Sequence, residues 1–430
     1  MIPALTGFVV LILLCFFGLR VGFATMFVGL VGFAYLRGWG PAFSLVGQQI
    51  MDDAMNYNLS VIPLFILMGT FIYRADLSRD LYDAAYAGFG RFRGGLALST
   101  VIACAGFAAV CGSSLATAAT MTKVAIPPMR HYRYADSLAS GSIAASGTLG
   151  IMIPPSVPLV IYAIVAQQDI GKLFIAGVLP GLLLVGLFLG AVRVTVWRNP
   201  EYGPAGDPLD PAVKRRALRV VWPILGLFVL VLGGIYGSIF TPTEAAGIGA
   251  FGAAVISMLR GHLRTLDEWI STLAEAARTT ATLFIVIFGA LVFAQFVNLS
   301  GLPYGLLDVV DALHLSPTGL VLAVIVIAIF MGMIFESIGI LLLLVPVFMP
   351  ALIQSGVNMI WFGIVVVLVT ELGLITPPIG MNVFVVKAVM PDLKLSRIFA
   401  GVTPFIGAIL VALVLIFLFP GIATFLPKWM

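Results

Sequence analysis

The chain has 430 residues, of which 61% are hydrophobic and only 10% are charged, and its mean hydropathy is +1.13. Soluble domains contain about 25% charged residues, so this composition excludes water-soluble enzymes, nucleic-acid-binding modules and disordered chains. Long unbroken apolar runs also exclude a β-barrel, whose strands alternate over about ten residues. We therefore predict an all-α polytopic membrane protein of about ten spans in a lipid bilayer, at roughly 20 residues a span. The net charge of +4 fits basic loops beside the membrane and not nucleic acid.

Two runs in the first half are too long for one span. As a single helix, 96–129 would measure about 51 Å, whereas a hydrocarbon core is about 30 Å thick. Cys111-Gly112-Ser113-Ser114 therefore predicts the tip of a re-entrant hairpin. Ile153-Pro154-Pro155-Ser156 breaks the second run, because proline lacks a backbone donor and clashes with the preceding turn. The elements expected in chain order are spans at 4–19 and 22–36, an amphipathic stretch at 40–57, a span at 59–73, a charged interfacial stretch at 74–95, the hairpin 96–129, the broken helix 134–167 and a span at 172–197.

A polar segment rich in Gly and Pro, 198–218, predicts a linker between two halves, 1–197 and 219–430. The second half repeats the plan of the first. Its expected elements are spans at 219–239 and 242–260, an amphipathic stretch at 263–277, a span at 279–298, a hairpin at 316–352 broken near Phe335-Glu336-Ser337, a broken helix at 356–390 interrupted at Thr376-Pro377-Pro378, and a span at 397–425.

The two halves match at one register. Six identities lie 223 positions apart: Ser114 with Ser337, Pro127 with Pro350, Leu149 with Leu372, Gly150 with Gly373, Pro154 with Pro377, and Pro155 with Pro378. Ala176-Gly177-Val178 and Pro180 then match Ala400-Gly401-Val402 and Pro404 at a spacing of 224. Five crossings per half invert the second copy relative to the first. Inverted repeats with paired broken helices are typical of secondary transporters.

Charge placement predicts the topology. With both termini outside, all but three of the 23 Lys and Arg residues fall in inside loops or their flanking turns; the exceptions are Arg37, Lys172 and Lys428. The positive-inside rule therefore favours periplasmic termini and a cytoplasmic linker. Residues 299–355 contain no Lys or Arg, as expected of a hairpin that enters from outside.

Irregular backbone at membrane depth is tolerated where it lines a cavity, so the two hairpin tips and two Pro-Pro breaks are the candidate sites. Their free carbonyls and hydroxyls suit a small cation such as Na⁺, and we expect no other metal. The first predicted cation site comprises Ser113, Ser114, Gly150, Ile153 and Pro155, and the second, near Glu336, comprises Ser337, Gly373, Thr376 and Pro378. The alternative is that these small residues only permit close helix packing.

Three polar side chains are candidates for substrate binding: Ser156, Glu336 and Asn382. An acid in a long apolar run is a functional candidate, and Glu371 is a second one. Either acid could bind a cation, relay a proton or pair with a neighbouring donor. The sequence contains no GxxxxGK phosphate loop and no HExxH, and its three histidines fall at predicted span ends, so we do not expect an enzyme.

Four segments make the chain resemble the large membrane subunit of tripartite ATP-independent periplasmic (TRAP) transporters, the DctM-like or SiaM-like permeases. The segments are Gly112-Ser113-Ser114-Leu115-Ala116-Thr117-Ala118-Ala119-Thr120, Gly147-Thr148-Leu149-Gly150-Ile151-Met152-Ile153-Pro154-Pro155-Ser156, Pro242-Thr243-Glu244-Ala245-Ala246-Gly247 and Thr376-Pro377-Pro378-Ile379-Gly380-Met381-Asn382. The resemblance extends over nearly the whole chain.

The resemblance implies a sodium-coupled importer of small organic acids that works by an elevator movement in the bacterial inner membrane. It also implies a soluble periplasmic substrate-binding protein and a small four-helix membrane subunit, which is expected to be separate because nothing precedes the first span. The family's sodium ligands lie at hairpin tips and helix breaks, in agreement with the sites above. Two alternatives stay open: a self-sufficient dicarboxylate symporter, and a non-transporting scaffold subunit.

Overall fold

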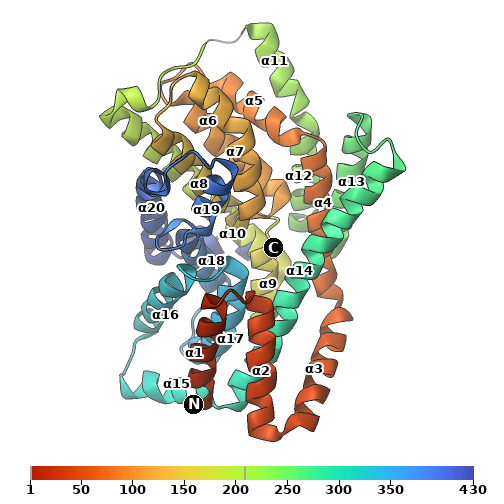
Figure 1. Ribbon diagram of the computed structural model, residues 1–430, viewed down its shortest axis with the longest axis vertical. Coiled ribbons are helices and arrows are strands. Elements are labelled where there is room, and N and C mark those ends of the chain that lie inside the picture. The colour runs from red at the N-terminus through yellow and green to blue at the C-terminus, as the bar shows by residue number, and fades with distance from the viewer. Residues whose placement is uncertain (1, 208–209) are drawn as a thin grey trace.

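The computed structural model describes residues 2–207 and 210–430, and across these residues the chain is helical, without a β-strand. Figure 1 shows helices that pack against one another at several angles and do not form flat layers. By length and composition, seven helices in the described parts are candidates to cross a membrane, or eight if the bent pair formed by residues 136–152 and 157–165 counts as one span. The first two predicted spans correspond to helices of 15 and 17 residues, shorter than that criterion.

One group of helices, called the frame here, comes from the beginning of each half. Its members are α1 (Ile2–Phe16), α2 (Val21–Arg37), α3 (Trp39–Ala54), α4 (Val61–Arg74), α12 (Trp222–Tyr236), α13 (Pro242–Leu259) and α14 (Leu266–Leu299). Helix α14 packs along α2 and α4, and α13 packs on α4 and α12. Glycines permit the α2–α14 contact: a Cβ at Gly289 would lie 2.1 Å from the carbonyl oxygen of Gly22.

The other group, called the core bundle, contains the hairpins and broken helices. From the first half come α6 (Gly95–Cys111), α7 (Ser114–His131), α8 (Asp136–Met152), α9 (Val157–Val165) and α10 (Ile170–Arg198). From the second half come α16 (Pro317–Gly332), α17 (Ser337–Gln354), α18 (Met359–Ile375), α19 (Met381–Val389) and α20 (Leu395–Leu418). The same order of hairpin, broken helix and long helix thus occurs twice. Helix α8 packs against α6, α7, α18 and α20, so the two halves share one interior.

Shorter helices connect these groups. They are α5 (Leu77–Phe89), α11 (Pro211–Val220), α15 (Leu302–Ala312), α21 (Gly421–Thr424) and the 3₁₀ turns η1 (Tyr57–Ser60), η2 (Pro200–Tyr202) and η3 (Leu426–Trp429). Helix α5 packs against α6 and α11. The predicted linker contains η2 and most of α11, while its residues 208–209 lie outside the described part of the chain.

Local chemistry explains where the helices stop. Helix α6 ends because Gly112 adopts a left-handed conformation (φ 61°), which a residue with a side chain rarely adopts. Helix α8 ends at Met152, before Pro154 and Pro155, and α9 continues at an angle of 41°. Ser156 begins α9, where its Oγ accepts a hydrogen bond from the backbone amide of Leu159. The Pro154–Pro155 and Pro377–Pro378 bonds are both cis.

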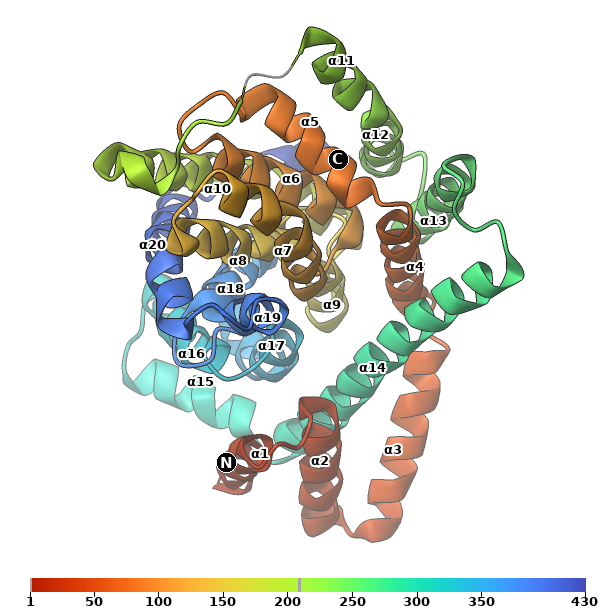
Figure 2. The same cartoon turned by 45° about the horizontal axis from the view of Figure 1, so that its top comes forward.

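The prediction that 263–277 is separate from the next span was wrong. Both belong to α14, a single helix of 34 residues. A capping box between Thr265 and Glu268 starts it, and its interior contains no proline that would end it. At 1.5 Å per residue it is about 51 Å long. Figure 2 shows α14 running diagonally between α2 and α3 on one side and the core bundle on the other.

Candidate functional site

The first hairpin tip joins α6 to α7. Ser113 precedes α7, and its Oγ accepts a hydrogen bond of 3.4 Å from the backbone amide of Ala116. Ser114 is the first residue of α7, so the partial positive charge of the helix N-terminus lies at this tip.

Glycine brings this tip against the first helix break. A Cβ at Gly150 would lie 3.0 Å from the carbonyl group of Ser113, and a Cβ at Gly112 would lie 2.9 Å from the carbonyl oxygen of Pro155. Four predicted residues of the first cation site, Ser113, Ser114, Gly150 and Pro155, are therefore neighbours. The fifth, Ile153, follows α8 directly, and its side chain packs against Gly181 of α10. Its side chain therefore points away from the other four residues, and only its backbone could contribute to the site.

Asn382 connects this tip to the other half of the chain. Its Oδ1 accepts a hydrogen bond of 2.7 Å from Ser114 Oγ, and its Nδ2 donates one of 3.0 Å to the carbonyl of Ala144. The side chain is fully buried, so both ends of the amide are used within the protein. Ser156 is also fully buried, and its Oγ donates to the carbonyl of Ile151 at 2.5 Å. Neither of these predicted substrate-binding residues belongs to the cavity described below.

The second hairpin tip differs from the first. Glu336 occupies the N-cap position of α17, but its side chain makes no capping hydrogen bond. Ser337 is the buried first residue of α17. Gly373 packs on the end of α16, where an added Cβ would lie 2.5 Å from Cα of Gly332. Thr376 Oγ1 donates to the carbonyl of Leu372 at 2.6 Å, and Pro378 is exposed, so the second break is more open than the first.

A cavity of about 350 Å³ lies between the two tips and the frame. The core bundle contributes Ser113, Ser114, Glu336 and Ser337, and α14 contributes the hydroxyls of Thr279 and Thr282. A second cavity of about 260 Å³ shares Ser113 and Thr279 with it and extends toward Glu275. Neither threonine was predicted as a site residue from the sequence, although the threonines at 279, 280 and 282 interrupt an apolar segment.

Glu371 is fully buried between the two broken helices. Its Oε2 accepts a hydrogen bond of 3.2 Å from Thr148 Oγ1, and its Oε1 has no partner within the described residues. The two residues are separated by 223 positions, the spacing of the internal repeat, so α8 and α18 meet through equivalent positions. Among the described residues, no cluster of three or more His, Cys, Asp or Glu is arranged to hold a metal ion.

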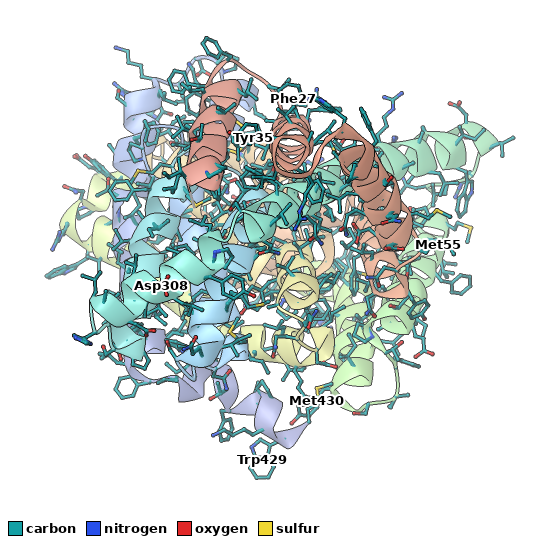
Figure 3. All side chains as sticks on the ribbon, turned by 90° about the horizontal axis from the view of Figure 1, so that it is seen from below. Phe27, Tyr35, Met55, Asp308, Trp429 and Met430 are labelled. Carbon is teal, nitrogen blue, oxygen red and sulfur yellow. The ribbon has the colours of Figure 1, made fainter. Side chains whose placement is uncertain are left out.

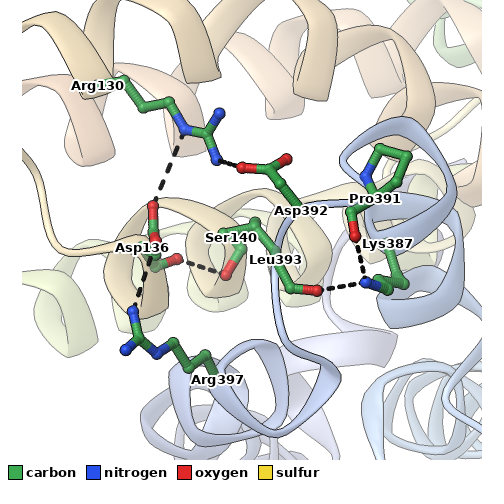
Figure 4. A network of polar contacts seen from close by, with 8 residues as sticks. All are labelled: Arg130, Asp136, Ser140, Lys387, Pro391, Asp392, Leu393 and Arg397. Carbon is green, nitrogen blue, oxygen red and sulfur yellow. Dashed lines mark hydrogen bonds and ion pairs between the residues drawn. The ribbon is translucent and has the colours of Figure 1, made fainter.

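A polar network closes one end of the core bundle (Figure 4). Arg130 of α7 pairs with Asp392 and, at 3.9 Å, with Asp136 of α8, and Arg397 of α20 pairs with Asp136 at 3.7 Å. The hydrogen bond from Arg130 lowers the pKa of the Asp392 carboxyl group. Lys387 Nζ donates to the carbonyls of Pro391 and Leu393 at 2.6 and 2.5 Å. The ion pairs join α7 and α8 of the first half to the segment between α19 and α20 and to α20 of the second half.

A family model and individual relatives both place the chain in the same family. The family model for the DctM component of tripartite ATP-independent periplasmic transporters matches residues 8–422. The C4-dicarboxylate TRAP transporter large permease protein of Pseudomonas aeruginosa is 37% identical over 89% of each chain. The sialic acid TRAP transporter large permease protein of Vibrio cholerae is 32% identical over 96% of each chain.

A solved structure is similar in fold. The crystal structure of the Alcanivorax borkumensis YdaH transporter superposes with a TM-score of 0.63, covers 89% of each chain and is 17% identical in sequence. At this identity the similarity concerns the fold alone. The two curated relatives are transporter permeases and not enzymes, which agrees with the prediction from sequence.

Proposed function

Because the chain belongs to the DctM component family of tripartite ATP-independent periplasmic transporters, we propose that it is the large permease subunit of a sodium-coupled, binding-protein-dependent secondary transporter. It imports a small organic acid, a carboxylate or a similar anion, across the bacterial inner membrane. The observation that carries the proposal is the cavity between the two hairpin tips, since hydroxyls and helix ends converge there in an otherwise apolar interior.

The coupling ions bind where the backbone is irregular. At the first tip, the hydroxyls of Ser113 and Ser114 and the carbonyl of Pro155 supply oxygen ligands, and the close approach at Gly150 holds them together. Ser114 Oγ donates its proton to Asn382, which leaves its lone pairs for a cation. At the second tip, Ser337, Gly373, Thr376 and Pro378 supply the corresponding oxygens. Hard oxygen ligands of this kind suit small cations.

The hairpins and broken helices of the core bundle move against the frame. The moving part comprises 96–167 and 316–390, and the frame stays fixed in the membrane, as an elevator mechanism requires. Two observations support this: each group is packed within itself, and both cavities lie where α4 and α14 of the frame meet the tips of the core bundle.

Two partners complete the transporter: a small four-helix membrane subunit and a soluble periplasmic binding protein. The frame has apolar surface for lipid or for a membrane partner, because Phe27, Tyr35 and Met55 are 54%, 80% and 75% exposed. Figure 3 labels these three residues, in α2 and directly after α3, away from the C-terminal Trp429. Both termini lie in the periplasm, in agreement with the distribution of Lys and Arg.

Uptake into proteoliposomes that contain the three components tests the function. We expect uptake to require an inward Na⁺ gradient and to proceed without ATP. If more than one Na⁺ accompanies each anion, an inside-negative potential will accelerate uptake, since each net charge gains about 2.3 kcal/mol per 100 mV. Full uptake in sodium-free, ATP-loaded vesicles would contradict the proposal.

A further inference from the structure

The cavity between the hairpin tips contains a single ionisable side chain that carries charge, Glu336. Its described lining residues include no Lys, Arg or His. The adjoining cavity adds Glu275, but that carboxylate is paired with Arg74 at 3.1 Å. Glu336 is therefore the charged group in this space that has no partner among the described residues.

Helix capping does not account for Glu336. The residue stands at the N-cap position of α17, yet its carboxylate accepts no hydrogen bond from the first turn of the helix. It forms no ion pair with the described residues, and no Lys or Arg occurs anywhere in 299–355. The side chain is half-buried and lines the cavity. The N-terminus of α17 carries a partial positive charge that offsets only part of the charge of an ionised carboxylate, so a cationic group beside Glu336 would stabilise it further.

The opposite tip offers the complementary chemistry. The N-terminus of α7 lies at the first tip, where the Ser113 hydroxyl and the positive end of the helix are available to an anion. The hydroxyls of Ser114, Thr279 and Thr282 already donate within the protein, to Asn382 and to the carbonyls of Glu275 and Arg278. The Ser113 hydroxyl and the helix end suit a carboxylate. The cavity thus presents donors at one tip and a carboxylate at the other, and its volume of about 350 Å³ suits a small ligand.

We propose that the organic acid carried by this protein is a zwitterion, whose cationic nitrogen lies against Glu336 and whose carboxylate lies against the first tip. The inference rests on the proposed function and narrows its substrate class. A dicarboxylate would place a second negative charge beside Glu336 without a basic residue to offset it. With a zwitterion of zero net charge, every coupled Na⁺ moves one net charge across the membrane.

Ligand binding to the full chain in lipid nanodiscs tests this preference directly. The probes are two zwitterions, glycine betaine and ectoine, and the dianion succinate, each titrated in Na⁺ buffer while the thermal unfolding temperature is measured. We expect at least one zwitterion to raise that temperature and succinate to leave it unchanged. A shift with succinate that equals or exceeds the zwitterion shifts overturns the inference, and so does the absence of a shift with both zwitterions.

The Glu336→Gln variant identifies the group responsible. It keeps the side-chain shape and removes the charge, so we expect zwitterion affinity to fall at least about tenfold, as for the loss of a hydrogen bond to a charged group. Glu336→Asp keeps the charge and should retain part of the affinity, and it replaces Glu336→Gln if that variant does not fold. The control is Asp308→Asn, which removes an exposed acid of α15 outside the cavity (Figure 3) and should bind as the wild type does.

The stabilisation by Na⁺ alone separates this inference from the proposed function. We expect Glu336→Gln to keep the Na⁺-induced rise in unfolding temperature. If the variant loses that rise but keeps the zwitterion shift, Glu336 is a sodium ligand, and the inference fails while sodium-coupled transport stands. Sodium-independent uptake by the wild type would instead remove the proposed function.

Discussion

The two tip serines, Ser114 and Ser337, are equivalent in the repeat but differ in their surroundings. Ser114 Oγ donates to the buried Oδ1 of Asn382, whereas Ser337 Oγ has no hydrogen-bond partner among the described residues. The repeat predicted both serines, but it could not predict this contact. Asn382 has an apolar residue, Leu159, at the position 223 residues earlier, so nothing in the first half indicates its role.

Replacement of each tip serine by alanine should separate ion binding from stability. If both hydroxyls bind cations, each variant should lose about 1–3 kcal/mol of binding free energy, or roughly five- to 150-fold in apparent Na⁺ affinity. Ser114→Ala should also unfold at a lower temperature, because it leaves Asn382 Oδ1 buried without its donor, whereas Ser337→Ala should not. Sodium-dependent uptake and thermal unfolding measure the two effects.

Ser99→Ala is the control for the tip variants. Ser99 is buried in α6, and its Oγ donates only to the carbonyl of Gly95 in its own helix. It should keep the wild-type Na⁺ affinity. Wild-type Na⁺ affinity in both tip variants would exclude these side chains as ligands and leave only backbone carbonyls.

Thr148 supplies the hydrogen bond that Glu371 receives in the described structure. The Thr148→Val variant keeps the shape and removes the donor, so the buried carboxyl group would lose its partner. We expect the free energy of unfolding to fall by about 1–3 kcal/mol. The control is Thr122→Val, which removes a buried hydroxyl that donates to the carbonyl of Ala118 in its own helix, α7. Equal losses in the two variants would show that the Thr148–Glu371 contact contributes nothing specific.

At the scale of elements, glycine and proline in the sequence mark positions where helices of the structure end. Helix α6 ends beside Gly112, and α8 and α18 end before their Pro-Pro pairs. Helix α14 was predicted less well. Its polar first part, which begins with a capping box, and its apolar second part resemble two separate elements in the sequence. Because a boundary was expected near 277–279, Thr279 was not predicted to line a cavity. Helix α15 carries charges within a short apolar segment and was not predicted.

Glycine-to-alanine substitutions test how closely the hairpins pack on the broken helices. Gly150→Ala would place a Cβ 3.0 Å from the Ser113 carbonyl group, and Gly373→Ala would place one 2.5 Å from Cα of Gly332. Overpacking of this kind costs about 1–3 kcal/mol, so both variants should be less stable and bind Na⁺ more weakly. Gly186→Ala in α10, which meets no atom within 4 Å, is the control and should be neutral or stabilising. Unchanged Na⁺ affinity in Gly150→Ala would mean that this contact does not shape the site.

At the scale of the whole molecule, composition predicted a helical membrane protein, and the described residues are helical with seven or eight candidate spans. The relation between frame and core bundle was only partly predictable. The stretch 74–95, predicted as a charged interfacial stretch, forms α5, which packs on α6 of the core bundle and is joined to the frame by the ion pair between Asp80 and Arg260. The position of α5 between the two groups depends on contacts between segments that are distant in the sequence, and such contacts cannot be predicted from hydropathy.

The proposed mechanism requires the two hairpin tips to move with the core bundle past a fixed frame, and a crosslink between the two groups tests this movement most directly. Ile66 of α4 and Leu115 of α7 line the same cavity from opposite groups. Both are changed to cysteine in a chain whose native Cys15, Cys104 and Cys111 have been replaced, and a reducible bis-maleimide joins them. A control pair at Thr6 and Val31 lines a groove within the frame.

Sodium-driven uptake is then measured before crosslinking, after crosslinking and after reduction. We expect uptake to stop when Ile66→Cys is joined to Leu115→Cys, to return on reduction, and to continue throughout in the control pair. Full uptake by a completely crosslinked frame–core pair would contradict a moving core bundle and, with it, the mechanism proposed for this transporter.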